Sequence, residues 1–129
     1  MDWVELPSAF LDRRPHELSG GQCQRVAIAR ALTVEPRLLI ADEVTSALDV
    51  TIQKQILDLM RRLREELQLT IVLISHDLGV VQAFCDRIAV MRAGAFVEQG
   101  SVDQILRSPR EDYTRELIAA FPRMPTDGP

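Results

Sequence analysis

Two adjacent glycines open a segment that otherwise has the pattern of an amphipathic helix, LSGGQCQRVAIARAL at residues 18–32. Glycine inside a helix costs about 1 kcal/mol relative to alanine, so the pair requires an explanation. Ser19 and Gln22 match a capping box, which accounts for both residues without any ligand. The box leaves Gly20 and Gly21 unexplained, whereas bare N–H groups at a helix N-terminus allow a phosphate to approach closely. The stretch therefore predicts either a simple helix start or an anion-binding one.

Two carboxylates, Asp42 and Glu43, end the apolar run LLIADE at residues 38–43. Neighbouring residues on a strand point to opposite faces, so at the strand tip the two side chains would serve different partners. One can hold Mg²⁺ through its water shell while the other faces an attacking water. The alternative, which is the commoner case for an isolated Asp-Glu pair, is that both carboxylates lie in a polar loop.

Two further polar segments follow, SALD at residues 46–49 and SHD at residues 75–77. Asp49 is expected to cap the next helix. His76 falls at the carboxyl end of a second apolar strand, where a lone histidine is more often a loop or capping residue than a catalytic one. Ligands of α/β sheets, however, bind at the carboxyl ends of parallel strands, and we expect His76 and the two carboxylates there.

The elements that must position these residues alternate between helices and strands, which favours an α/β fold with a mainly parallel sheet. An ion pair between Asp58 and Arg62 is expected on the second long helix. A turn is expected at Ala93-Gly94, between two strands. The pattern predicts helices at residues 20–35, 50–67, 78–84, 102–107 and 112–120, and strands at residues 37–42, 69–75 and within 87–100.

Composition excludes several classes of protein. The 129 residues suit one domain, and 15 basic against 19 acidic residues argue against a non-specific grip on nucleic acid. No apolar run approaches the roughly 20 residues that span a bilayer, and the first residues lack the pattern of a signal peptide. Cys23 and Cys85 form no CxxC pair, which suits a reducing compartment and supplies no metal site.

In this order and at these spacings, LSGGQ, LLIADE, SALD and SHD closely resemble the ATP-binding subunits of ABC transporters over about residues 11–122. The resemblance implies the C-terminal half of a P-loop NTPase domain, with ATP and Mg²⁺ as cofactors and a second ATP-binding subunit as partner. It also implies site roles: a signature motif of Ser19, Gly20, Gly21 and Gln22 that contacts the γ-phosphate of ATP on the opposing subunit; Mg²⁺ binding by Asp42; orientation or activation of water by Glu43; an interface position for Asp49; and a γ-phosphate contact for His76.

A finer resemblance lies in residues 13–32 and 108–122, which look like the dipeptide, oligopeptide and nickel importer subfamily. It implies docking on membrane permeases at the cytoplasmic face of the bacterial inner membrane, and leaves the substrate and the permeases open. Residues 1–36 would be the end of a helical subdomain with the signature motif, residues 37–122 the C-terminal part of the ATPase core, and residues 123–129 a disordered tail.

Two departures from the family pattern matter. Val44 replaces the proline that usually follows the catalytic glutamate, which removes no chemical group. The phosphate-cradling loop GxxxxGK[ST] is absent, and Lys54, the only lysine, has no glycine beside it. The adenine-stacking aromatic residue and the glutamine loop, which the family places before the signature, are missing too. The resemblance therefore implies that this chain alone is inactive.

Three classes of function follow. The first is the ATPase part of a peptide-type importer, and the second is a non-catalytic remnant or complementing piece that binds another ATPase subunit. The third, a soluble ABC-type ATPase of DNA repair or translation, is disfavoured by the acidic charge. In the family, the P-loop strand separates the strand at residues 69–75 from the next one. Its absence would leave apolar strand edges, so we expect self-association or only partial order.

Overall fold

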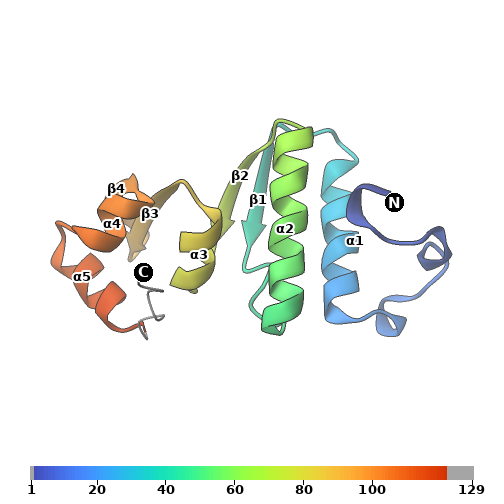
Figure 1. Ribbon diagram of the computed structural model, residues 1–129, viewed down its shortest axis with the longest axis horizontal. Coiled ribbons are helices and arrows are strands. Elements are labelled where there is room, and N and C mark those ends of the chain that lie inside the picture. The colour runs from blue at the N-terminus through green and yellow to red at the C-terminus, as the bar shows by residue number, and fades with distance from the viewer. Residues whose placement is uncertain (1, 122–129) are drawn as a thin grey trace, which may run out of the picture. The chain divides into compact units, whose positions relative to one another are not determined.

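A computed structural model describes residues 2–121, which divide into two compact units between Ser75 and His76 (Figure 1). Each unit is described by itself. The expected tail at residues 123–129 lies outside the described residues. No helix of residues 2–121 is both long and apolar enough to cross a bilayer.

The first unit pairs two long helices with a small parallel sheet. β1 and β2 run in register from Leu38 opposite Thr70 to Asp42 opposite Ile74. The connection between them is a helical crossover, which parallel neighbours require. The elements are three 3₁₀ turns at Asp2–Val4, Ser8–Phe10 and Pro15–Glu17, then α1 at Gly20–Leu32, β1 at Leu38–Asp42, α2 at Val50–Glu66 and β2 at Thr70–Ile74.

The core of the first unit lies between the helices, the inner side of the sheet and the N-terminal segment. The buried residues of α2 recur at helical spacing, as the apolar pattern predicts. Val4 and Leu6 of the N-terminal segment are also buried. From the helices and the sheet the core takes Ile28, Leu32, Ala41, Ile56, Leu57, Leu59, Met60 and Leu63.

Continuous apolar runs such as those of β1 and β2 are typical of strands covered on both faces, but in this unit the sheet is covered on one face only. One face of the two-stranded sheet remains open, because alternate residues of each strand point away from the helices. The exposed fractions along this outer face are Leu38 51%, Ile40 61%, Val72 45% and Ile74 46%.

The second unit is built on an antiparallel hairpin. β3 and β4 are joined at Ala93 and Gly94, whose φ angles of 49° and 80° are both positive, as a tight hairpin turn requires. The predicted turn is therefore confirmed. The elements are α3 at Leu78–Phe84, β3 at Arg87–Arg92, β4 at Ala95–Ser101, α4 at Val102–Arg107 and α5 at Asp112–Ala119.

Two local expectations need correction. α1 ends at Leu32, three residues before the predicted end, and Thr33 caps it through its N–H bond to the Arg30 carbonyl. Asp58 pairs with Arg61 at 2.7 Å instead of Arg62. The Arg62 guanidinium bonds to the Trp3 carbonyl at 3.0 Å, so the N-terminal segment draws it away from its neighbour on the helix.

Candidate functional site

The start of α1 is a capping box, as the sequence predicts. The Ser19 N–H donates to Gln22 Oε1 at 2.9 Å, and the Gln22 N–H donates to Ser19 Oγ at 3.3 Å. The next amide, of Cys23, donates to the Ser19 carbonyl at 2.9 Å. Nothing within residues 2–121 accepts a hydrogen bond from the N–H groups of Gly20 or Gly21. These two donors stand at the positive end of the helix dipole, where an anion is favoured.

Both glycines also have a packing reason that the sequence analysis missed. A Cβ added at Gly21 would lie 2.6 Å from Ile52 Cγ2, and one at Gly20 would lie 3.2 Å from Leu48 Cδ2. The first distance is one that real Cβ atoms do not adopt. Packing is therefore an explanation of the glycines beside the two that the sequence left open, since contact between the first turns of α1 and α2 excludes a side chain at Gly21.

Asp49 caps α2, as predicted. Its Oδ1 accepts from the Ile52 N–H at 3.1 Å, and its carbonyl accepts from the Gln53 N–H at 2.8 Å. Figure 1 shows that α1 and α2 begin at the same end of the first unit, and that β1 runs toward that end. The capped starts of both helices and the carboxyl end of β1 are therefore directed toward one end of this unit.

The two strand-end carboxylates differ in their backbone. Asp42 is the last residue of β1 and is exposed. Glu43 lies just beyond the strand, with a φ of 51°, and its N–H donates to the Ile74 carbonyl at 2.9 Å. Strand alternation therefore ends at Asp42, and the expectation of opposite faces does not extend to Glu43. A left-handed backbone at a non-glycine residue is uncommon and costs about 1–3 kcal/mol.

The loop between β1 and α2 holds Glu43 in this conformation. The Glu43 carbonyl accepts from the backbone N–H of Ser46 at 3.2 Å and from its hydroxyl at 3.0 Å. The Leu48 N–H then donates to the carbonyl of the buried Thr45 at 3.2 Å. Leu48 Cδ2 would lie 3.2 Å from a Cβ added at Gly20, so this loop reaches from the strand end to the start of α1.

His76 begins the second unit, and its side chain is exposed. The next residue, Asp77, caps α3 through its Oδ1, which accepts from Gly79 and Val80 at 2.8 and 3.2 Å. The other seven predicted site residues belong to the first unit. The meeting of His76 with the strand-end carboxylates therefore stays a prediction.

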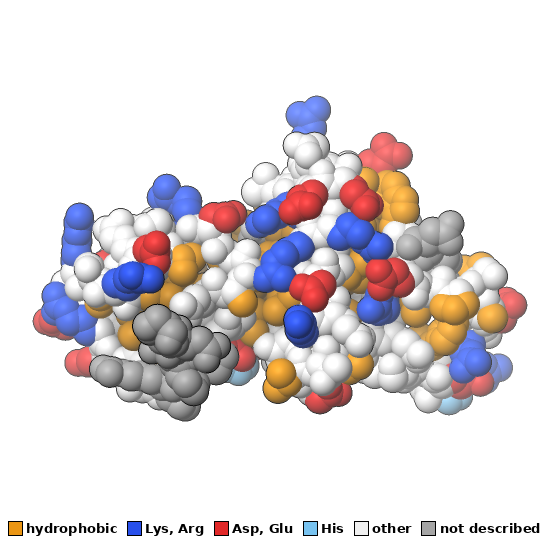
Figure 2. Space-filling model, in the orientation of Figure 1, with side chains coloured by type: hydrophobic (Ala, Val, Ile, Leu, Met, Phe, Trp, Pro, Cys, Tyr) orange, Lys and Arg blue, Asp and Glu red, His pale blue; other side chains and the backbone are white. Residues whose placement is uncertain are grey.

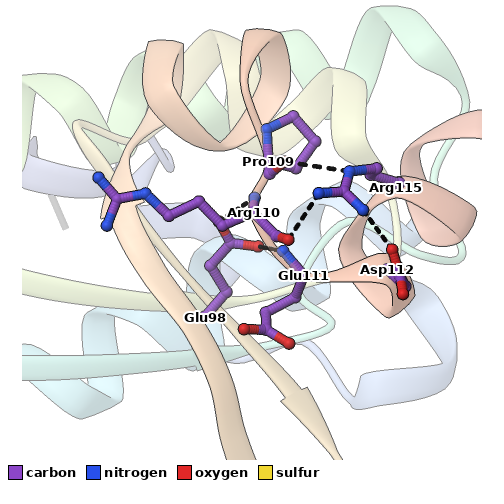
Figure 3. Close-up of polar contacts among 6 residues, drawn as sticks. All are labelled: Glu98, Pro109, Arg110, Glu111, Asp112 and Arg115. Carbon is purple, nitrogen blue, oxygen red and sulfur yellow. Dashed lines mark hydrogen bonds and ion pairs between the residues drawn. The ribbon is translucent and has the colours of Figure 1, made fainter.

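A buried carboxylate in the second unit escaped the sequence analysis. Glu98 of β4 accepts the backbone N–H groups of Arg110 at 2.8 Å and Glu111 at 3.2 Å, just before α5 (Figure 3). The Arg110 bond, foremost, holds the pKa of Glu98 below its ordinary value. The Thr114 hydroxyl also lowers this pKa, although no hydrogen bond of standard geometry joins the two side chains. The available signal was strand alternation, which places Glu98 and Gly100 on the same inward side.

The segment before α5 is braced a second time by Arg115. Its guanidinium donates to the Pro109 carbonyl at 3.2 Å and to the Arg110 carbonyl at 2.7 Å, and it pairs with Asp112 (Figure 3). Arg92 of β3 stacks on the Tyr113 ring at 4.7 Å. These contacts fix the start of α5 to the hairpin.

A surface concavity of about 520 Å³ in the first unit carries mixed charge, in keeping with the interspersed acidic and basic side chains of Figure 2. Glu5 pairs there with Arg25 at 2.9 Å and with Arg62 at 3.0 Å. Its remaining lining residues are Gln55, Asp58 and Leu59. The ion pairs join the N-terminal segment to both helices, which is a structural role.

The residues present fit part of a nucleotide site. Among residues 2–121 no group of three or more His, Cys, Asp or Glu is arranged to hold a metal. Mg²⁺, however, commonly takes one or two protein carboxylates together with phosphates and water, which Asp42 alone could satisfy. The glycine donors of α1 suit one edge of a phosphate. A cradle for a whole triphosphate is missing, because Lys54 lies exposed on α2 without a glycine-rich loop.

Comparison with known proteins gives one family match: residues 1–46 match the model described as ABC transporter. The chain is 51% identical to the oligopeptide transport ATP-binding protein OppD of Bacillus subtilis (strain 168), over 97% of this chain and 35% of OppD. It is also 51% identical to the glutathione import ATP-binding protein GsiA of Escherichia coli (strain K12), over 96% of this chain and 20% of GsiA. The chain thus spans well under half the length of these relatives.

Solved structures agree. The ATP-binding cassette MJ0796, in a dimeric post-hydrolysis state bound to ADP and Pi, is similar with a TM-score of 0.67 and 39% identity. The match covers 78% of this chain and 43% of that one. The ADP conformation of MJ1267, an ATP-binding cassette of an ABC transporter, matches with a TM-score of 0.77 and 27% identity, over 93% of this chain and 47% of that one. The chain therefore belongs to the ABC transporter family and corresponds to part of its ATP-binding subunits.

Proposed function

We propose that this chain supplies the signature helix and the catalytic carboxylate of an ATPase subunit that energises a bacterial importer of di- or oligopeptides or nickel. The observation that carries the proposal is that the starts of α1 and α2, with their caps and open N–H donors, lie at the end of the first unit toward which β1 and its terminal carboxylates run. Relatives named for peptide and glutathione import support the substrate class.

Each residue then has a role that its surroundings support. Ser19, Gly20, Gly21 and Gln22 would meet the γ-phosphate of ATP held by a second ATP-binding subunit. A dimeric relative bound to ADP and Pi is in keeping with this arrangement. Asp42 would hold Mg²⁺, which offsets phosphate charge, and Asp49 would lie at the interface between subunits. His76 would contact the γ-phosphate.

Glu43 would act on water. A carboxylate at this point can orient the attacking water or accept a proton from it. This is the part of phosphate hydrolysis that a side chain supplies. The place of Glu43 directly after the end of β1, where its N–H is held by the Ile74 carbonyl, supports this role. Val44 in place of proline leaves this chemistry intact.

The wider setting follows from the same proposal. Residues 1–36 would form the end of a helical subdomain, and residues 37–122 the C-terminal part of the ATPase core. Membrane permease subunits would be the docking partners, at the cytoplasmic face of the inner membrane. A net charge of −4 supports the absence of a nucleic-acid partner.

The decisive experiment joins this chain to the N-terminal part of a relative and measures phosphate release. Glu43→Gln keeps the shape of the side chain but removes its charge, so hydrolysis should fall by orders of magnitude while ATP binding persists. Ser19→Arg should instead block dimer closure by its bulk. The matched control is Glu111→Gln, a change of an exposed carboxylate away from the proposed chemistry. Hydrolysis by the Glu43→Gln protein at the parental rate would refute the assignment.

A second candidate is a non-catalytic piece that binds another ATPase subunit through the start of α1. The sequence feature that favours it is the missing GxxxxGK[ST] loop. The DNA upstream of the Met1 codon separates the candidates. An in-frame P-loop would support the ATPase, an interrupted one a decayed gene, and a separate neighbouring gene for the missing part a complementing piece.

A further inference from the structure

We propose that Ile52 and Leu48 are positioning residues that lock the first turn of α1 to the first turn of α2. The start of α1 and the Asp49 cap would then behave as one rigid body. The inference rests on the close approach at the two glycines and on the caps that fix each helix start.

The contact at Gly21 is the stronger of the two. Gly21 is buried, and its missing Cβ would overlap Ile52 Cγ2 at 2.6 Å. This methyl is attached directly to the β-carbon, and isoleucine in a helix occupies essentially one χ1 rotamer. It therefore cannot swing away, and only glycine fits opposite it.

The contact at Gly20 is softer. The nearest atom is Leu48 Cδ2 at 3.2 Å, at the far end of a flexible side chain that can move by a few tenths of an ångström. Gly20 is exposed, in contrast to Gly21. Ile52 thus supplies most of the lock, and Leu48 joins it to the loop that follows Glu43.

The helix caps fix the positions of Ile52 and of the turn that contains Gly20 and Gly21. The Ile52 N–H bonds to Asp49 Oδ1, so the cap that ends the loop also sets the position of the locking methyl. On the facing helix, Ser19 and Gln22 fix the turn that contains both glycines. The open donors of Gly20 and Gly21 therefore keep a constant position relative to Asp49.

The use of this rigidity rests on the proposed function, in which the open donors and Asp49 meet the same second subunit. Because the start of α1 and the Asp49 cap are already fixed to each other, they need not be ordered separately when the subunits associate. Binding then loses less free energy to ordering. The lock itself is independent of ATP and can be tested on the chain without any ligand.

The test compares Gly21→Ala alone with Gly21→Ala/Ile52→Leu and Gly21→Ala/Ile52→Val in the full chain. Leucine lacks the β-branched methyl, whereas valine retains it. We expect Gly21→Ala to lower the thermal midpoint or prevent folding, Ile52→Leu to rescue it, and Ile52→Val not to. The difference between the two double variants should be about tenfold or more in the folding equilibrium constant. Gly20→Ala is the matched control and should respond equally to both Ile52 changes.

Hydrogen exchange supplies a readout that general destabilisation would not move. In Gly21→Ala, amides of residues 19–25 and 49–55 should both exchange about tenfold faster, with β3 and β4 unchanged, and Ile52→Leu should restore both segments. Equal rescue by valine and leucine, or loosening of one segment alone, would overturn the lock. A rebuilt ATPase unaffected by Glu43→Gln would overturn the proposed function and leave this result standing.

Discussion

The starts of α1 and α5 find hydrogen-bond acceptors for their backbone N–H groups in different ways. At α5, a buried carboxylate from another strand takes the N–H groups of Arg110 and Glu111. At α1, the cap is local and the N–H groups of Gly20 and Gly21 remain without an acceptor in the described chain. The difference lies in how each start is anchored: α5 is held by a carboxylate from a distant strand, whereas α1 is held by its own first turn and by close packing against Ile52.

The first prediction concerns how tightly the start of α1 can bind ATP by itself. We expect this chain alone to show no ATP hydrolysis and to bind Mg-ATP no more tightly than millimolar. One helix terminus contributes about 0.3–2 kcal/mol toward a neighbouring charge, whereas millimolar binding requires about 4 kcal/mol. Calorimetry and a phosphate-release assay measure both quantities. Micromolar binding, or turnover lost in Glu43→Ala, would reveal a nucleotide site outside this account.

The second prediction extends the comparison to the open sheet face of the first unit. We expect the isolated chain to self-associate, because Ile40 and Val72 present apolar side chains beside unpaired strand edges. Ile40→Lys should shift light-scattering mass toward the monomer. The matched control is Phe96→Lys, since Phe96 is equally exposed at 61% but lies on the hairpin. A parental chain that is already a monodisperse monomer with a sharp melt would contradict the prediction.

The third prediction tests the hydrogen bonds of Glu98 to the segment before α5. Glu98→Ala should lower the melting midpoint of the second unit by several degrees, because it leaves the amides of Arg110 and Glu111 without their acceptor. The pKa of Glu98 in the folded chain lies below the ordinary value of 4.5, so its contribution is complete above about pH 4.5 and is lost as the pH falls through the lower folded-state pKa.

Melting curves between pH 3 and 7 check the sign of this effect. In Glu98→Gln, that part of the acid dependence should disappear. Glu111→Gln is the control, because its side chain makes no capping bond. Identical acid profiles for the parental chain and Glu98→Gln would show that the carboxylate does not stabilise α5 in this way.

The smallest effect is expected at the local cap. Ser19→Ala removes the acceptor of the Gln22 N–H and should destabilise the first unit by about 1 kcal/mol. Ser19→Asp, which can cap equally well, should restore stability. Denaturant unfolding followed by circular dichroism distinguishes the variants. A loss much larger than this would mean that Ser19 has partners beyond its own helix.

Local chemistry made much of this structure predictable from the sequence. The Ser19–Gln22 box, the Asp49 cap and the Ala93-Gly94 turn depend on residues within a few positions of one another. The parallel pairing of β1 and β2 followed from two apolar runs joined by a helix. The candidate residues themselves came from four short motifs.

Features set by distant parts of the chain could not be read in this way. Three contacts join residues far apart in the sequence. Ile52 packs closely against Gly21, Glu98 accepts the N–H of Arg110 before α5, and Arg62 donates to the Trp3 carbonyl. The left-handed backbone of Glu43 likewise depends on the Ile74 carbonyl of the neighbouring strand. Each requires the fold before its partner can be named.

The backbone at Glu43 bears on how this protein responds to selection. Glycine adopts a φ of 51° freely, and asparagine does so more readily than glutamate. A mutant library sorted only for heat resistance should therefore enrich glycine and asparagine at position 43. Laboratory evolution for robustness would in this way select against the carboxylate, as at other left-handed positions such as Glu35 and Gln68, so any such campaign needs a simultaneous screen that retains Glu43.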